Sequence, residues 1–262
     1  MPDEEVEVAK DAAREAGEVM DRFQRDGFEV DRKDSYTDLV TEADHEAQRR
    51  MVETIREEFP EDGFLGEEGL EPDGEDRVWV IDPIDGTTNF VHGFPYYCVS
   101  IALREDGISK VGVVFAPALN ELYHGVRGSG SFVNGDPISV SDVSDVREGL
   151  VVAGGSSWAS KGTNDLQLGI LRELVETPVS FRFPGASALE YCHLAAGHFD
   201  GKLQVLAHPW DIAAGTLVLE EAGGETRVRE SVVDGYTEVV ASNGRQQEEL
   251  EEIFDRHVRH ED

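Results

Sequence analysis

Strand-like and helix-like segments alternate through the second half of the chain, and this alternation constrains the fold more than any other feature. Short apolar runs predict strands over residues 150–153, 179–183 and 202–206. Segments of helical periodicity between and after them predict helices over residues 164–175, 187–196 and 211–222. Such an alternation is typical of a layered α/β fold, with helices packed on a sheet.

The first half adds two helices and a set of strands. Apolar residues three or four apart predict a helix from Val6 that ends near Gly27, and a second helix that follows Thr41 and is closed by Pro60. Strands are predicted over residues 77–82, 97–103 and 111–115. The glycine-rich stretch 125–137 predicts hairpin turns and matches no P-loop pattern. We expect two halves, residues 1–146 and 147–262.

The charge of the chain is extreme. The 262 residues include 55 acidic and 23 basic ones, a formal net charge of -32, and only five of the basic residues are lysines. Acidic residues occur from end to end, so the whole surface repels itself, and salt would screen that repulsion. We interpret the chain as adapted to a salt-rich cytoplasm, the alternative being an acidic protein with a basic partner. The charge argues against nucleic acid or an anionic membrane as a partner.

The cysteines and the N-terminal segment favour a cytoplasmic location. Cys98 and Cys192 are far apart and have no CxxC or Cys/His ligand spacing, so neither a disulfide framework nor a zinc site is predicted. The first ten residues, MPDEEVEVAK, do not combine a basic region with an apolar run, and no apolar stretch approaches the ~18 residues that span a bilayer.

Two carboxylates follow a strongly apolar strand. In VWVIDPIDGTTNF (residues 78–90) the strand delivers Asp82, Pro83 bends the backbone, and Asp85 and Gly86 turn it into a helix start. Carboxylates placed so can converge on neighbouring cations, and Mg²⁺ prefers such hard oxygen ligands. Amides after Gly86 can hold phosphate oxygens. The alternative is that Asp85 only caps the next helix. The spacing differs from the Asp-x-Asp of haloacid dehalogenase phosphatases, which disfavours their covalent mechanism.

Other acidic residues have both a structural and a functional interpretation. Glu67 and Glu68 lie in a glycine-flanked loop before the Asp82 strand, and Asp211 opens a helix that it could simply cap. Asp44 follows Thr41 with the spacing of a capping box. His208 could be a ligand, although a lone histidine is more often packed or capped.

Together these segments resemble the inositol monophosphatase family, part of the larger group that includes fructose-1,6-bisphosphatases. The resemblance is carried by DPIDGTTNF (residues 82–90), WDIAAGTLVLEEAGG (residues 210–224), DLVTEAD (residues 38–44) and GEEG (residues 66–69). It covers nearly the whole chain and implies an αβαβα sandwich, a homodimer, and a phosphatase that uses two or three Mg²⁺ ions.

The resemblance also implies roles for individual residues. The metal ligands would be Glu67, Asp82, the Ile84 carbonyl, Asp85 and Asp211. Thr87 and Asp44, together with Glu67, would position and activate the attacking water. Phosphate contacts would come from Asp85, Gly86, Thr87 and Thr88, and leaving-group contacts from Ser187 and Gln204. Lys33 corresponds to a lysine of the active-site loop.

The substrate is less constrained than the reaction. Relatives that hydrolyse 3′-phosphoadenosine phosphates usually have Lys-Glu where this chain has Thr88 and Asn89. We therefore expect inositol monophosphate, fructose 1,6-bisphosphate or both as substrates. Inositol-specific relatives usually carry Glu at the position of Gln204, which argues against strict inositol specificity. The alternatives are a 3′(2′),5′-bisphosphate nucleotidase and a catalytically silent, metal-binding or regulatory relative.

Overall fold

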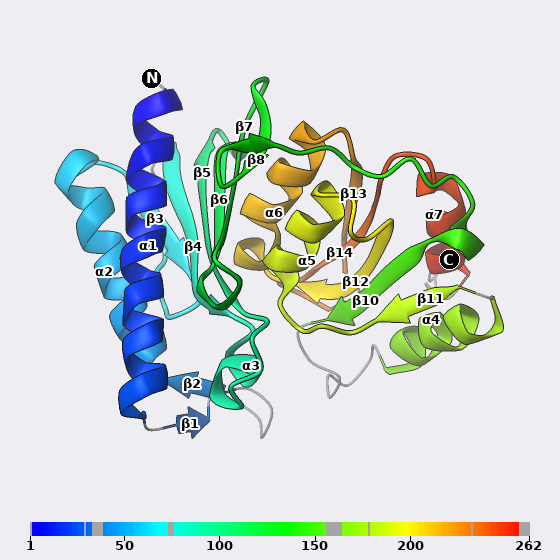
Figure 1. Cartoon of the computed structure of the whole chain (residues 1–262), viewed down its shortest axis with the longest axis horizontal. Coiled ribbons are helices and arrows are strands. Elements are labelled where there is room, and N and C mark those ends of the chain that lie inside the picture. Colours follow the sequence, from blue (N-terminus) through cyan, green and yellow to red (C-terminus); the bar gives the residue numbers. More distant parts are fainter. Residues whose placement is uncertain are drawn as a thin grey trace.

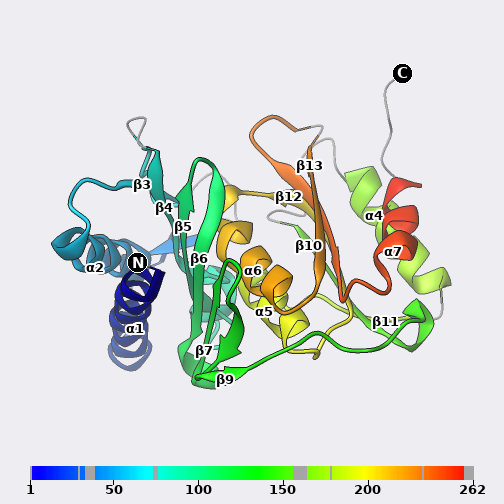
Figure 2. The same ribbon diagram turned by 90° about the horizontal axis from the view of Figure 1, so that it is seen from above.

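The computed structural model describes residues 2–28, 30–32, 39–72, 76–155, 164–177, 179–231 and 233–256. Helices and sheets alternate in five layers, as Figures 1 and 2 show from two directions. An outer helix pair covers a seven-stranded sheet, a middle pair lies between this sheet and a five-stranded one, and a third pair covers the far side. The predicted αβαβα sandwich is therefore confirmed. The division of the chain near residue 146 stays a prediction.

The outer pair consists of α1 (Pro2–Asp26) and α2 (Glu42–Glu58). α1 ends where the sequence predicts, before Gly27 with its φ of 84°, and α2 begins where it predicts, after Thr41, whose side chain caps the helix. A short antiparallel pair, β1 (Val30–Arg32) and β2 (Leu39–Thr41), joins the two helices. Lys33 lies outside the described residues.

The first sheet has the strand order β3-β4-β5-β6-β7-β8-β9. Only β3 and β4 are parallel, and the other neighbours run antiparallel. Its strands are β3 (Gly63–Gly66), β4 (Arg77–Asp85), β5 (Cys98–Glu105), β6 (Ile108–Ala116), β7 (Glu121–Val126), β8 (Gly130–Val133) and β9 (Asp136–Pro137). The glycine-rich stretch forms the hairpins β7 to β9, as predicted. β4, by contrast, runs on to Asp85 instead of ending at Asp82.

The second sheet has the order β11-β10-β12-β14-β13. Its strands are β10 (Leu150–Gly155), β11 (Ser180–Arg182), β12 (Gly201–Ala207), β13 (Glu225–Glu230) and β14 (Thr237–Ser242). The helices of this half are α4 (Asn164–Glu176), α5 (Ser187–Ala195), α6 (Pro209–Glu221) and α7 (Gln247–Asp255), and α3 (Thr87–Val91) follows β4 in the first half. The predicted strands and helices up to residue 222 are confirmed, with ends that coincide or are shifted by up to four residues. The sequence patterns gave no prediction for β13, β14 or α7.

Three apolar clusters hold the layers together. One joins α1 and α2 to the first sheet through residues such as Met20, Met51 and Trp79. The largest surrounds α5 and α6 between the two sheets, and the third joins the second sheet to α4 and α7. The middle helices are thus covered on both sides, which explains why α6 is apolar almost all round. Their N-terminal ends lie beside the end of β4 and form the candidate site.

Candidate active site

A β-bulge brings Asp82 and Asp85 to one side of β4. Asp82 pairs with Ser100 of β5 and Asp85 with Cys98, so three steps along β4 match two steps along β5. Residues three apart on a regular strand point to opposite faces, and the extra residue of a bulge reverses this. Pro83, which cannot donate a ladder hydrogen bond, lies within the bulge. The bulge in the Asp-Pro-Ile-Asp segment therefore directs the two carboxylates to the same side of β4.

Asp82 is buried among other carboxylates. It is 2% exposed, and its Oδ1 accepts the N–H of Ile84 at 3.1 Å. Glu67 directly follows β3, which pairs in parallel with β4 so that Gly66 lies opposite Ile81. Burial, followed by the charges of Glu67, Asp85 and Asp211, raises the pKa of Asp82 well above its ordinary value. The carboxylates of the cluster therefore repel one another.

Asp85 caps a helix, but not the one that follows it in sequence. The N-cap residue of α3 is Gly86, at a φ of 91°, and no side chain caps that helix. The Asp85 carboxylate instead accepts the N–H of Ser187 at 2.9 Å and that of Ala188 at 2.6 Å, at the start of α5. Burial raises the pKa of Asp85 to about 6, although these two hydrogen bonds act to lower it. The alternative that Asp85 only caps the next helix is wrong.

Asp211 joins the cluster from α6. It is the third residue of the helix, two positions later than the sequence pattern indicates, and its Oδ2 accepts the N–H of His208 at 2.8 Å. Burial first, and then the charge of Asp85, raise the pKa of Asp211 well above its ordinary value. Capping and membership of the cluster therefore coexist. His208 stacks on Trp210, with ring centroids 4.6 Å apart.

Thr87 and Asp44 meet at the edge of the cluster. The Asp44 carboxylate accepts both the N–H and the hydroxyl of Thr41, which completes the predicted capping box. Its other oxygen lies 3.5 Å from Thr87 Oγ1, which also lies 3.0 Å from the Ile84 carbonyl oxygen. Asp44 is 1% exposed, and burial raises its pKa to about 7 against the lowering effect of the Thr41 bonds. Asp44 thus caps α2 and also lies within hydrogen-bond distance of Thr87.

The donor set fits a hard divalent cation. Buried carboxylates are normally paired with a cation or a metal, yet in the described part of the chain no Lys or Arg forms an ion pair with Asp44, Asp82, Asp85 or Asp211. In the same described part of the chain, no group of three His, Cys, Asp or Glu side chains lies at the spacing of metal ligands. The available donors, carboxylate oxygens and the Ile84 carbonyl oxygen, are nevertheless of the hard type that Mg²⁺ prefers.

The residues predicted to contact the leaving group are Ser187, at the start of the helix that Asp85 caps, and Gln204, on the neighbouring strand β12. Gln204 of β12 is 2% exposed, and its Oε1 accepts the hydroxyl of Ser187 at 2.9 Å and that of Tyr191 at 2.8 Å. The structure therefore brings Ser187 and Gln204 into direct contact and connects them to Asp85 through the Ser187 backbone. Thr88, a predicted phosphate contact, lies exposed in the first turn of α3.

Sequence reasoning missed three residues of this region. Asn89 Nδ2 donates to the carbonyl oxygens of Tyr96 at 2.7 Å and Pro184 at 2.9 Å, which ties α3 to the loop before α5. Lys202 and Glu190 form a buried ion pair beside Ser187. The signal for Lys202 was present, since a lysine stands in the otherwise apolar strand GKLQVLA. The position of Asn89 carries no such local signal.

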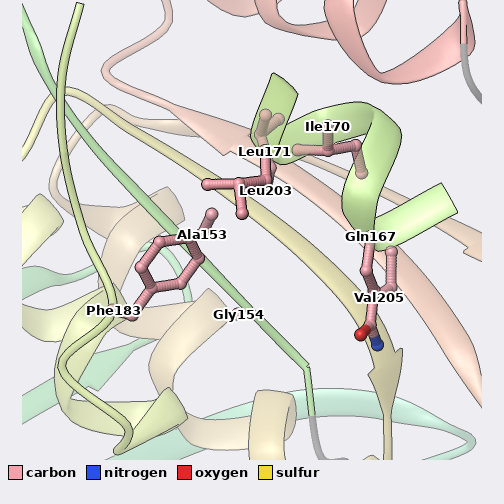
Figure 3. Close-up of a pocket in the computed structure, with 8 residues that line it drawn as sticks. All are labelled: Ala153, Gly154, Gln167, Ile170, Leu171, Phe183, Leu203 and Val205. Atoms are coloured by element: carbon pink, nitrogen blue, oxygen red, sulfur yellow. The ribbon is translucent and has the colours of Figure 1, made fainter. Parts of the chain in front are cut away.

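A pocket on the far face of the second sheet is separate from this cluster. It lies between α4 and strands β10 and β12, and Figure 3 shows Ile170 and Leu171 of α4 near Leu203 of β12. Its lining is apolar except for Gln167. None of the predicted site residues lines it.

Comparison with known proteins gives one family. The family model described as "Inositol monophosphatase family" matches residues 1–259. A protein of Thermotoga maritima named fructose-1,6-bisphosphatase/inositol-1-monophosphatase is 42% identical over 195 residues, 74% of this chain and 73% of that protein. The Nus factor SuhB of Pasteurella multocida is 39% identical over 221 residues, 83% of this chain and 82% of that protein.

A solved structure agrees with the fold. The Thermotoga maritima IMPase superposes with a TM-score of 0.85 at 34% identity, covering 98% of each chain. The match of the family model over nearly the whole chain, together with these identities, shows that the chain belongs to the inositol monophosphatase family.

Proposed function

We propose that this phosphatase of the inositol monophosphatase and fructose-1,6-bisphosphatase type depends on Mg²⁺ and hydrolyses inositol monophosphate, fructose 1,6-bisphosphate or both. The observation that supports this most is the burial of Asp82, Asp85 and Asp211 in one cluster, where the charge of Asp85 raises the pKa of the other two and no Lys or Arg of the described residues forms an ion pair with them. Such a cluster is costly to the metal-free protein and is explained by divalent cations.

The metal ligands would be the carboxylates of Glu67, Asp82, Asp85 and Asp211 and the carbonyl oxygen of Ile84, holding two or three ions. Bound Mg²⁺ would neutralise charge on the phosphoryl oxygens and make water a better nucleophile. The chain holds these oxygens rigidly: Asp85 and Asp211 are each fixed by backbone N–H groups at a helix start.

Asp44 and Thr87 would orient the attacking water. The Thr87 hydroxyl has one proton and two acceptors, the Ile84 carbonyl at 3.0 Å and Asp44 at 3.5 Å. When the proton points to Asp44, the lone pairs of Oγ1 can accept a proton from water. As Oγ1 takes up the water proton, its own proton passes to the Asp44 carboxylate, and a pKa raised to about 7 allows that transfer near neutral pH. Direct attack by water requires no phosphorylated side chain.

The first turn of α3 would contact the phosphate. The opening N–H groups of a helix have no partner within it, and here they belong to Thr87 and Thr88, after Gly86. A Cβ at position 86 would lie 3.1 Å from the Tyr96 carbonyl oxygen and from the Gly185 carbonyl oxygen, and the positive φ adds strain. Glycine is therefore needed there for the turn. Ser187 and Gln204 would contact the leaving group.

We also propose a homodimer in a salt-rich cytoplasm, with neither nucleic acid nor a membrane as a partner. The net charge of -32 argues against both of these partners. No helix of the described residues is both long and apolar enough to cross a membrane.

A phosphate-release assay tests the function. It would use inositol 1-phosphate, fructose 1,6-bisphosphate and 3′-phosphoadenosine 5′-phosphate in molar KCl, with Mg²⁺ or with EDTA. We expect Mg²⁺-dependent release from one or both of the first two substrates. Preferred hydrolysis of the third would instead support the bisphosphate nucleotidase.

A regulatory role is the second candidate. It is favoured by the 39% identity to a protein named Nus factor SuhB. The two candidates differ in the same assay, because a catalytically silent relative would bind Mg²⁺ and release no phosphate from any of the three substrates.

A further inference from the structure

The second sheet presents a polar strip toward the candidate site. Side chains alternate across β12, so Leu203 and Val205 face α4 and line the pocket of Figure 3. Lys202 and Gln204 lie on the opposite face and contact α5. Lys202 is 1% exposed. A lysine is rarely buried to this degree unless its charge is paired and its N–H groups are bonded, so its partners indicate its role.

Every N–H group of the Lys202 ammonium has an acceptor. Nζ lies 2.5 Å from Glu190 Oε2 and 3.1 Å from both the backbone oxygen and Oγ of Ser187. Nζ also lies 4.2 Å from the centroid of the Tyr191 ring. The second carboxylate oxygen of Glu190 accepts the N–H of Gly185 at 3.0 Å. The ion pair is therefore fixed to the first turn of α5 and the loop before it.

The ammonium sets the direction of the next hydrogen bond, because it can only donate. Ser187 Oγ accepts from Lys202, so its proton is available for Gln204 Oε1 at 2.9 Å. Tyr191 donates to the same oxygen. Within the described residues, the Gln204 side chain accepts both of its hydrogen bonds through its carbonyl oxygen. The NH₂ group of the amide is therefore the group that can donate to a ligand.

We infer that Lys202, held by Glu190, is a positioning residue that makes Gln204 present an N–H donor to the leaving group. The inference rests on the proposed function, in which Gln204 contacts that group. Without Lys202, the Ser187 hydroxyl could accept as readily as donate, as the Tyr191 hydroxyl already can, and the Gln204 amide could turn over at little cost.

The orientation of this amide matters for one class of leaving group. A sugar hydroxyl both donates and accepts, so it can bond to either end of the amide. A phosphate oxygen at neutral pH accepts, and its bond to an N–H group is charge-assisted. The fixed orientation therefore favours a leaving group that carries a second phosphate, as in a sugar bisphosphate, over a neutral polyol.

The test replaces the ion pair by a neutral pair of similar size, Lys202→Met with Glu190→Gln. Replacing Lys202 alone would leave a buried carboxylate unpaired and destabilise the fold. The values of kcat/KM would be measured for fructose 1,6-bisphosphate, inositol 1-phosphate and phenyl phosphate, whose leaving group has no second phosphate or ring hydroxyl. We expect the bisphosphate-to-inositol ratio to fall by about threefold to tenfold, the effect of one hydrogen bond, with phenyl phosphate unchanged.

Two further variants separate positioning from a structural role. Ser187→Ala breaks the connection without touching the ion pair and should shift the ratio in the same direction, including in the event that the double variant does not fold. In a Gln204→Leu background the double change should leave the ratio constant. A parallel loss for all three substrates, an unchanged ratio, or a shift that persists without Gln204 would overturn the inference. A wild type that hydrolyses none of the three would overturn the proposed function as well.

Discussion

The Asp85 carboxylate accepts the N–H of Ala188 at 2.6 Å, a contact between residues 103 positions apart in the sequence. One oxygen of a proposed metal ligand therefore also caps the N-terminus of α5. Because the helix dipole is positive at this end, it favours the ionised form of Asp85. The contact couples the ligand cluster of the first half to the leaving-group residues of the second, and several predictions about stability and activity depend on it.

Asp82→Asn and Asp85→Asn should differ in stability although both abolish turnover. Each removes an anionic ligand, so Mg²⁺ binding weakens in both. Asp85→Asn also leaves one of two helix amides without a carboxylate oxygen, at a cost of about 0.5–2 kcal/mol. Asp82→Asn relieves repulsion, so the melting temperature of the metal-free protein should not fall. Calorimetry in EDTA and Mg²⁺ titration check both, and equal melting temperatures would contradict the capping role.

A matched control for the metal ligands is Asp200→Asn. Asp200 is also buried, but it accepts the N–H of Leu150 at 2.8 Å and a hydroxyl bond from Ser141, away from the cluster. Its substitution should lower stability and leave Mg²⁺ affinity unchanged. Asp211→Asn should instead lower the affinity for Mg²⁺ and should not lower the stability of the metal-free protein. If Asp211→Asn retained near-normal turnover, the proposed ligand set would be wrong.

Asp44→Asn should make the stability of the metal-free protein less sensitive to pH. The pKa of Asp44 is raised from 3.8 to about 7, so its contribution to stability is present below pH ~4 and is lost as the pH rises through ~7. Asn retains an oxygen that can accept the Thr41 bonds but does not ionise. The melting temperature, measured from pH 5 to 8 in EDTA and molar KCl, should therefore fall less steeply in the variant than in the wild type. The two proteins have the same surface charge, so the difference reports the buried carboxyl. Parallel curves would contradict the buried-carboxyl assignment.

The local patterns predicted much of this site, and tertiary contacts account for what they missed. Apolar periodicity located α1, α2 and the strand that carries Asp82, because burial of one face leaves a direct trace in sequence. The bulge that aligns Asp82 with Asp85 depends on pairing with β5, which no local pattern records. Likewise, Asp85 reads as a cap for α3 because α3 is adjacent, whereas the helix it caps begins a hundred residues later.

The unpredicted C-terminal strands have a similar cause. β13 (ETRVRE) has Val228 as its one apolar residue, so its strand character comes from pairing with β14. Lys202 could be recognised as unusual in an apolar strand, but its partner Glu190 lies on a different element and only the folded chain brings them together. Position in the chain alone cannot identify such pairs.

Thr87→Ala should lower kcat strongly without trapping a phosphorylated enzyme. The variant loses the hydroxyl that lies between Asp44 and the Ile84 carbonyl oxygen, while the carboxylates stay in place. Mg²⁺ affinity should change little. Rapid quenching with ³²P-labelled substrate followed by mass spectrometry checks the result, and a phosphorylated side chain that forms and decays at the turnover rate would exclude direct attack by water.

Molar KCl should stabilise the fold. With a net charge of -32, repulsion across the surface is strong in dilute buffer, and the Debye length falls to ~3 Å at 1 M salt. The melting temperature should rise between low and molar KCl, and NaCl at equal ionic strength should give a similar rise. A melting temperature that stayed flat or fell would remove the interpretation of the chain as adapted to high salt.

The position of β14 has a consequence for the growing polypeptide. Although β14 (Thr237–Ser242) is the last strand of the described residues, it is inserted between β12 and β13 in the sheet. Until the ribosome has released it, β12 has an open edge, and the strand that bears Gln204 lacks its neighbour Val239. A chain truncated before Thr237 would therefore expose an apolar strand instead of forming a smaller enzyme, and we expect it to aggregate. We therefore expect no phosphatase activity before β14 has been made.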